Sequence, residues 1–247
     1  MSGHSKWANI KHRKGAQDAK RGKIFTKIIK EITVAARLGG GDIDANPRLR
    51  TAVSNGKSNN LPIDNISRAI KKGTGELEGV SYEEVTYEGY GPGGVAIIMD
   101  IITDNKNRTV AEVRHLLSKY GGNLGETGSV AWVFDKKGQI ILDSKSGDED
   151  VVFEAALEAG ADDFEAADGF YRVTTNPTTL IDVQDSMENS GYEIQSAEIE
   201  MVPKTLQRLE GQEAQSALKL MDALEDNDDI NKLYSNFDVD EEALLQD

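Results

Sequence analysis

Apolar residues in the first third of the chain recur every three or four positions. The stretch KIFTKIIKEITVAARL, residues 23–38, predicts an amphipathic helix that ends at Gly39-Gly40-Gly41. Its apolar positions are Ile24, Phe25, Ile28, Ile29, Ile32, Ala35 and Ala36. Asn46-Pro47 then reads as the N-cap and first-turn proline of a second helix, RLRTAVSNGK. A third helix is predicted to start near Pro62 and to end at Gly73.

From Val80 onward the hydrophobic period shortens to that of strands. EEVTYEGY and VAIIMDIITD flank GPGG, which predicts a β-hairpin. Thr109 and Glu112 fit a capping box at the start of the helix TVAEVRHLLSKY. SVAWVFD and QIILD read as two strands on either side of a turn at KKG.

The remaining pattern predicts a second module of the same kind. A helix is expected near EDVVFEAALEAG, short strands near DDFEAA and FYRVTT, a helix after Asn176-Pro177, and a strand in YEIQSAEIEMV. The tail from Thr205 carries one more helix, with Leu218, Met221 and Leu224 on one face, and an acidic end. We therefore expect an α+β protein: an N-terminal helical domain, then two small α+β domains with helices on one face of an antiparallel sheet.

Composition excludes several classes of protein. Hydrophobic residues make up 38% of the 247 residues and charged residues 29%, which is typical of a soluble globular chain. No apolar run approaches the ~20 residues of a membrane span, and the basic N-terminus lacks the apolar stretch of a secretory signal. The chain has no cysteine, so disulfides and thiol nucleophiles are excluded. We expect a cytoplasmic protein with no membrane partner.

Charge is divided unevenly along the chain. The net formal charge is −15, yet residues 1–75 hold 16 basic and 5 acidic residues, and the remainder holds 12 basic and 38 acidic residues. An asymmetry of this size predicts a polyanion partner for the basic part.

The cations concentrate near the N-terminus, where only Asp18 opposes nine of them: Lys6, Lys11, Arg13, Lys14, Lys20, Arg21, Lys23, Lys27 and Lys30. We predict that these side chains bind nucleic-acid phosphates, with Trp7 as a stacking surface and His12 as an additional donor. Such contact tolerates any base sequence. The alternative is a solvated helix face on which Trp7 serves as a core residue.

Three motifs resemble chemical sites without the required context. GYGPGG, residues 89–94, is followed by a strand and not a helix, so it predicts a turn and no dinucleotide site. GDIDANP lacks the glycine and glutamate of a calcium loop. His4 and His12 have no converging ligands for a metal. We therefore expect no cofactor, no metal, no small-molecule substrate and no enzymatic activity.

The strings GHSKWANIKHRKGAQDAKRGKIFTKIIKEITVAARLGGGDIDANPRLR, NNLPIDNISRAIKKG, YEGYGPGGVAIIMDIITDNKNRTVAEVRHLLSKYGGNLGETGSVAWVFDKKG and EAALEAGADD resemble the YebC/PmpR family over nearly the whole chain. That family includes the mitochondrial translational activator of cytochrome oxidase. The resemblance implies a helical domain at residues 1–78, a discontinuous α+β domain at 79–134 and 204–247, and a third domain, 135–203, inserted in the second.

The resemblance also implies a function. Members are described as cytoplasmic DNA-binding transcriptional regulators, while the mitochondrial branch acts in translation and some bacterial members are linked to the ribosome. We therefore expect a DNA-binding transcriptional regulator that uses its basic N-terminal domain. The alternative is a translation factor bound to ribosomal or messenger RNA, and a third reading is a hydrolase acting on nucleic acid. The sequence shows no recognition helix with regularly spaced base-reading side chains.

Overall fold

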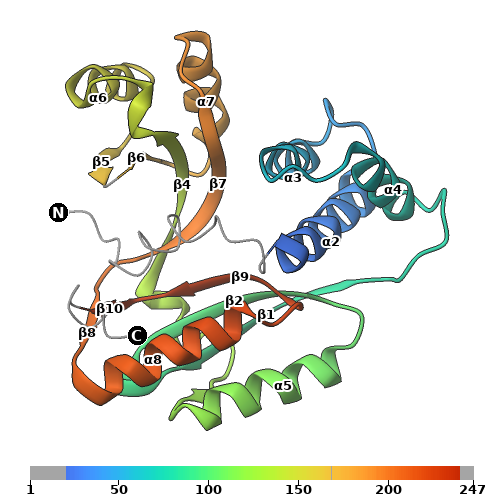
Figure 1. Cartoon of the computed structure of the whole chain (residues 1–247), viewed down its shortest axis with the longest axis vertical. Helices are drawn as coiled ribbons and strands as arrows, with labels where there is room; N and C mark the ends of the chain where they lie inside the picture. Colours follow the sequence, from blue (N-terminus) through green and yellow to red (C-terminus); the bar gives the residue numbers. More distant parts are fainter. Residues whose placement is uncertain (1–20, 168, 240–247) are drawn as a thin grey trace. The chain divides into compact units, whose positions relative to one another are not determined.

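The computed structural model describes residues 21–167 and 169–239, which form two compact units with an α+β fold (Figure 1). Residues 134–204 make one unit, and the described residues on either side of them in the sequence make the other. We call these the smaller and the larger unit. Within the described ranges, no helix has the length and apolar character needed to cross a membrane.

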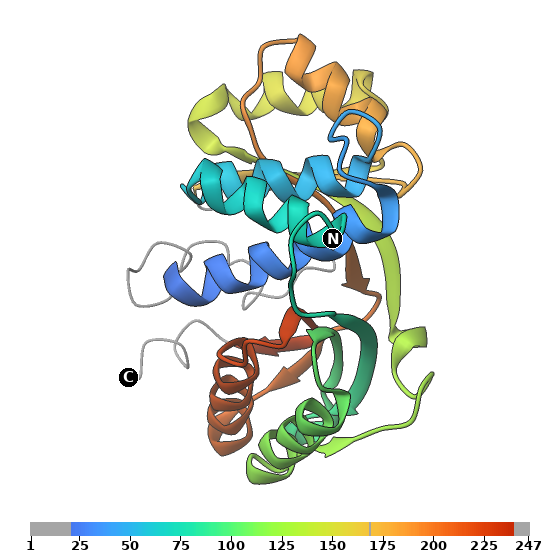
Figure 2. The ribbon, with the colours of Figure 1, turned by 90° about the vertical axis from the view of Figure 1, so that its right-hand side faces the viewer.

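The described part of the larger unit begins with three helices, as predicted: α2 (Arg21–Gly39), α3 (Pro47–Ser58) and α4 (Ile63–Gly73). They share one apolar core, in which α2 supplies Ile28, Ile32, Ala35 and Ala36, α3 supplies Leu49, Ala52 and Val53, and α4 supplies Ile66 and Ala69. Figure 2 shows α2 beside α3 and α4 in a second view. The outer faces of α3 and α4 are left to solvent.

Asn46 joins two of these helices. Its side-chain oxygen accepts from the Leu49 N–H at 3.1 Å, which is the predicted N-cap of α3. Its amide nitrogen donates to the carbonyls of Ala35 and Gly40, at 2.9 and 2.8 Å, at the end of α2. One buried side chain therefore fixes the end of one helix and the start of the next.

A four-stranded sheet follows, in the order β3-β1-β2-β9. The predicted hairpin is β1 (Glu83–Tyr90) and β2 (Ala96–Thr103), and β3 (Asn123–Leu124) pairs with β1. The connection at Pro92–Gly94 is a tight turn in which Gly93 and Gly94 have φ of 64° and 76°. The prediction of a turn at GYGPGG is confirmed, because these positions need the left-handed conformation that glycine tolerates.

Two helices from distant parts of the sequence cover one face of this sheet (Figures 1 and 2). They are α5 (Lys106–Lys119) and the predicted tail helix, α8 (Gly211–Glu225). The tail then returns as β9 (Ile230–Ser235) beside β2, and β10 (Phe237–Val239) pairs in parallel with β8 (Gln207–Leu209). The interpretation of the tail as one helix with an acidic end missed these strands.

The smaller unit is a second antiparallel sheet, in the order β5-β6-β4-β7. It contains β4 (Phe134–Asp143), α6 (Glu149–Glu158), β5 (Asp163–Ala167), β6 (Phe170–Thr175), α7 (Leu180–Asn189) and β7 (Ile194–Pro203). Side chains of α6 and α7, including Val152, Val183 and Met187, form one core with Ile140 and Val173 of the sheet. These elements confirm the predicted module.

The predicted capping box of α5 is wrong. The helix starts one turn earlier, at Lys106, and Asn105 caps it by accepting from the Arg108 N–H at 3.1 Å. Asparagine is a stronger N-cap than threonine. Thr109 therefore lies inside the helix, buried, with its hydroxyl 2.7 Å from Asp229.

The predicted turn at KKG is also wrong. Ala131–Val133 form one turn of 3-10 helix, and β4 then runs unbroken from Phe134 to Asp143. Lys136 and Lys137 pair with Met201 and Glu200 of β7. Gly138 lies in this strand opposite Thr175. Glycine is needed there because a Cβ at that position would overlap the Thr175 hydroxyl.

Candidate nucleic-acid interface

Most of the predicted phosphate contacts lie outside the described residues. These are Lys6, Trp7, Lys11, His12, Arg13, Lys14 and Lys20. Arg21 begins α2, and its side chain is not described. Lys23, Lys27 and Lys30 are described, and all three sit on the side of α2 that faces the end of α8 and the start of β9.

Lys23 and Lys27 cap the C-terminus of α8. Lys23 Nζ donates to the Asp226 carbonyl at 3.0 Å and lies 3.3 Å from the Asp226 carboxylate. Lys27 Nζ donates to the Glu225 carbonyl at 2.6 Å. The last carbonyls of a helix lack intrahelical donors and carry partial negative charge, so ammonium groups stabilise them. Cations predicted for phosphate contact are thus engaged by the protein's own oxygens.

Lys30 is buried and uses all of its donor capacity inside the protein. Its ammonium lies 2.6 Å from Asp229 Oδ1, 2.9 Å from the Asp228 carbonyl and 3.3 Å from the Ile102 carbonyl. An ammonium has three N–H donors, and three acceptors surround this one. The Tyr82 ring lies 5.7 Å from the same nitrogen. Contact between Lys30 and a phosphate stays a prediction, and it would require this arrangement to open.

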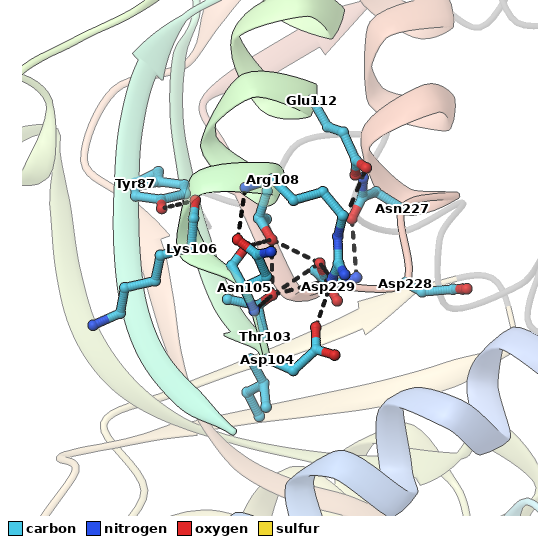
Figure 3. A network of polar contacts seen from close by, with 12 residues as sticks. Tyr87, Thr103, Asp104, Asn105, Lys106, Arg108, Glu112, Asn227, Asp228 and Asp229 are labelled. Atoms are coloured by element: carbon cyan, nitrogen blue, oxygen red, sulfur yellow. Dashed lines mark hydrogen bonds and ion pairs between the residues drawn. The ribbon is translucent and has the colours of Figure 1, made fainter. Parts of the chain in front are cut away.

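Asp229 is the centre of the network that Figure 3 shows. Its Oδ2 accepts from Arg108 Nη2 at 2.7 Å and lies 2.7 and 3.0 Å from the hydroxyls of Thr109 and Thr103. Arg108 also donates to Asp104 at 2.8 Å. Helix α5, strand β2 and the start of β9 therefore meet on one carboxylate.

The surroundings of Asp229 keep it ionised. Burial by itself would raise the pKa of its carboxyl, but hydrogen bonds from Lys30, Thr109 and Arg108, with the charge of Lys30, lower that pKa well below its ordinary value. Charged hydrogen bonds of this length are among the strongest in proteins. The network fastens α2 to the sheet of the larger unit.

A different set of cations is exposed on the outer faces of α3 and α4. The set, here called the α3–α4 cations, is Arg50, Lys57, Arg68, Lys71 and Lys72. Spacings of three, four and seven residues place each helix's members on one side of that helix. None of these five is ion-paired with another residue in the described part of the chain. These five were not among the predicted phosphate contacts. The spacing of Arg68, Lys71 and Lys72, opposite Ile66 and Ala69 on the same helix, is the signal in the sequence that indicates them.

One further exposed feature was missed from the sequence. The buried Glu88 carboxylate accepts from the backbone N–H groups of Gly128, Val130 and Ala131 at 2.6, 2.8 and 2.9 Å. The loop so held presents Trp132, which is 70% exposed and whose indole N–H donates to the Ser129 carbonyl at 2.9 Å. The predicted strand SVAWVFD is therefore wrong at Trp132, which lies in the 3-10 turn Ala131–Val133.

Among the described residues, no group of three or more His, Asp or Glu side chains is arranged to hold a metal ion. His115, the one histidine described, is exposed on α5. The polar side chains described above for the larger unit form ion pairs and hydrogen bonds with one another.

The fold and its surface define a multi-domain α+β protein whose cations gather on its N-terminal helices. Two family models match this chain: the TACO1/YebC protein N-terminal domain over residues 5–76, and the TACO1/YebC second and third domain over residues 82–237. The chain belongs to the TACO1/YebC family.

Relatives with assigned names are similar over almost their whole length. A probable transcriptional regulatory protein of Geobacter sulfurreducens is 59% identical over 244 residues, covering 99% of this chain and 98% of its own. One of Trichlorobacter lovleyi is 60% identical with the same coverage. A crystal structure of a conserved hypothetical protein from Aquifex aeolicus aligns with a TM-score of 0.91 at 46% identity, covering 98% of this chain and 100% of the other. Both named relatives are called probable transcriptional regulatory proteins.

Proposed function

We propose that this protein is a nucleic-acid-binding regulator of gene expression that docks its basic N-terminal helices on DNA. The observation that carries the proposal is the division of charge. Residues 1–75 hold 16 basic and 5 acidic residues in a chain of net charge −15. The names of the relatives, probable transcriptional regulatory proteins, support the same class of function.

The α3–α4 cations supply a surface of the required kind. They project from two helices that pack on α2, and the helices keep their apolar sides in a common core. Lysine and arginine on such a face bind phosphates and release condensed counterions, so affinity falls steeply as salt rises. We expect the predicted N-terminal cations, from Lys6 to Lys20, to extend this surface.

The exposed side chains of this face favour backbone contact over base reading. Three of the five α3–α4 cations, Lys57, Lys71 and Lys72, are point charges that suit phosphates, whereas Arg50 and Arg68 carry the planar fork that also reads bases. Ribosomal RNA presents the same phosphates as DNA. Binding to RNA on the ribosome is therefore the second candidate function. Comparing binding to DNA with binding to ribosomes distinguishes the two.

Binding of the full-length protein to duplex DNA of random sequence, promoter DNA and purified ribosomes, compared as salt is raised, tests the proposal. A transcriptional regulator should keep a large preference for promoter DNA over random duplex as non-specific binding fades. Loss of both DNAs together, with ribosome binding retained, would assign the cations to RNA. Absence of binding to all three at low salt would refute the proposal.

A further inference from the structure

The acidic segment that ends α8 and leads into β9 covers part of the lysine face of α2. This segment, residues 225–229, has the sequence Glu-Asp-Asn-Asp-Asp, with four carboxylates in five residues. Oxygens of the segment contact Lys23, Lys27 and Lys30, which recur at intervals of four and three residues along one side of α2. The geometry points to a second phosphate-binding surface on α2, formed by Lys23 and Lys27, that this segment occupies and nucleic acid uncovers.

The segment offers these lysines what a phosphate backbone would offer. Lys23 is bound by one carboxylate and one carbonyl oxygen, and Lys27 by a helix-terminal carbonyl. Both ligand types are anionic or partly anionic oxygens at hydrogen-bond distance. A phosphate backbone that reaches α2 therefore offers Lys23 and Lys27 oxygens of the same kind as those they leave.

The contact between Lys23 and Asp226 is exposed and weak, whereas the contact between Lys30 and Asp229 is buried and strong. In the Lys23–Asp226 pair the side chains are 43% and 56% exposed, whereas in the Lys30–Asp229 pair they are 10% and 7% exposed. Exposed pairs contribute little to stability and are screened by salt, while breaking a buried pair is strongly unfavourable. The Lys30–Asp229 pair thus serves as a pivot, and the exposed Lys23–Asp226 contact is the first to release.

The interface around this pivot is polar, unlike the apolar cores on either side of it. The three helices and the sheet of the larger unit have separate apolar cores. Polar groups join them, including Glu31 with Asn231 at 2.9 Å and Arg48 with Glu84 at 2.6 Å. The connecting residues 74–81 are exposed throughout. Polar interfaces between separately packed parts permit relative motion.

The inference of a covered surface rests on the proposed function. Removing the carboxylate that contacts Lys23 tests it. Asp226→Asn removes the carboxylate that pairs with Lys23. Asp228→Asn is the matched control, because it removes the same charge two residues away and its side chain points away from the polar network in Figure 3. We expect Asp226→Asn to bind duplex DNA about two- to fivefold tighter at low salt, the factor that an exposed ion pair supplies, and Asp228→Asn to gain clearly less. In a Lys23→Gln background the gain from Asp226→Asn should vanish.

Because the chain has no cysteine, fluorescent labels can report the movement directly. Ser54→Cys on α3 and Ser118→Cys on α5 form a pair that spans the polar interface. Ser118→Cys and Lys219→Cys form a control pair on helices that share one core. Energy transfer should change on addition of duplex DNA for the first pair and stay constant for the second.

The outcomes distinguish failure of the covered surface from failure of the proposed function. Equal affinities of Asp226→Asn and Asp228→Asn, with unchanged energy transfer in a wild-type protein that still binds DNA, would overturn the covered surface and leave the proposed function standing. Failure of the wild-type protein to bind any nucleic acid would overturn both.

Discussion

At the scale of single residues, Asp229 and Glu88 are two buried carboxylates with complementary partners. Asp229 is 6% exposed and is surrounded by Lys30, Arg108 and two threonines. Glu88, also 6% exposed, takes three backbone N–H groups and no cation within the described residues. In both cases hydrogen bonding to the charged form offsets the cost of burial. One carboxylate ties helices to strands, and the other shapes a loop.

Replacement of Asp229 by Asn should make stability depend differently on pH. The pKa of Asp229 is lower in the folded protein than the ~3.9 of an unfolded aspartate, so its contribution is present above about pH 4 and is lost as pH falls further. Removing one member of a buried pair costs about 3–5 kcal/mol at neutral pH. Urea unfolding followed by circular dichroism should show the wild-type advantage shrinking in acid.

The control for this experiment is Asp228→Asn, an exposed neighbour whose replacement should change the free energy of unfolding by about 0.5 kcal/mol or less. A wild-type advantage over Asp229→Asn that stays constant from neutral to acid pH would contradict the assigned ionisation.

Glu88→Gln should loosen the loop that precedes β4. Glutamine keeps one oxygen acceptor for three N–H groups, and leaving a buried donor unpaired costs about 1–3 kcal/mol. Urea unfolding would measure the loss, with Glu126→Gln, an exposed residue of the same loop, as the control. Equal stabilities of the two variants would show that the carboxylate does not organise the loop.

At the scale of elements, helix ends are fixed by single polar side chains. Asn46 serves two helices, since it caps α3 and binds two carbonyls at the end of α2. Asn105 serves one, as the cap of α5. Gly73 matters for another reason: a Cβ there would meet the Thr33 carbonyl, so α2 and α4 depend on glycine for their close approach.

Alanine substitutions at the two caps should therefore differ in cost. Asn105→Ala loses one cap, worth about 1 kcal/mol. Asn46→Ala loses a cap and two further hydrogen bonds, each worth about 1 kcal/mol, so the expected loss is about 2–3 kcal/mol. Thermal unfolding of the two variants compares them directly. A cost at Asn46 no greater than that at Asn105 would mean that its bonds to α2 add nothing.

Local pattern predicted the helices and the first hairpin well because their signals lie within a few residues. Asn46-Pro47 and the Gly39–Gly41 run mark helix boundaries that neighbouring side chains decide. Two errors had different causes: near Thr109 the stronger cap is Asn105, four residues earlier, and at Gly138 a distant partner decides. Thr109 looked like a cap but bonds to Asp229, 120 residues away, and Gly138 looked like a turn but packs against Thr175.

The sequence predicted the charge of the candidate site but not the arrangement of its side chains. The sequence places Lys23, Lys27 and Lys30 on one side of a helix, but only the return of the tail as β9 brings Asp226 and Asp229 to them. That return depends on pairing between strands about 130 residues apart, and β9 lies in a stretch whose acidic flanks resemble a solvated tail. Long-range pairing leaves no local signature.

At the scale of the whole molecule, the distribution of charge determines which surface a polyanion can approach. The basic region precedes two strongly acidic α+β modules, whose net negative charge disfavours the approach of a polyanion. The docking that we propose therefore uses the N-terminal helices, where the α3–α4 cations are exposed. The described lysines of α2 lie under the chain's own acidic segment.

The most direct measurement is a salt titration of duplex DNA binding by a charge-reversal variant of α4, Arg68→Glu with Lys71→Glu and Lys72→Glu. These residues are exposed on one helix face, so the variant should fold as the wild type does. We predict that affinity falls more than about tenfold and that the slope of log affinity against log salt decreases by about two to three, one for each lost phosphate contact.

The matched control reverses the same numbers of arginine and lysine on the helices of the sheet: Arg114→Glu, Lys119→Glu and Lys219→Glu, all exposed. It changes the net charge equally and should leave the slope unchanged and the affinity within about twofold, the share due to long-range charge alone. Equal losses of affinity and slope in the two variants would contradict docking through the basic helices.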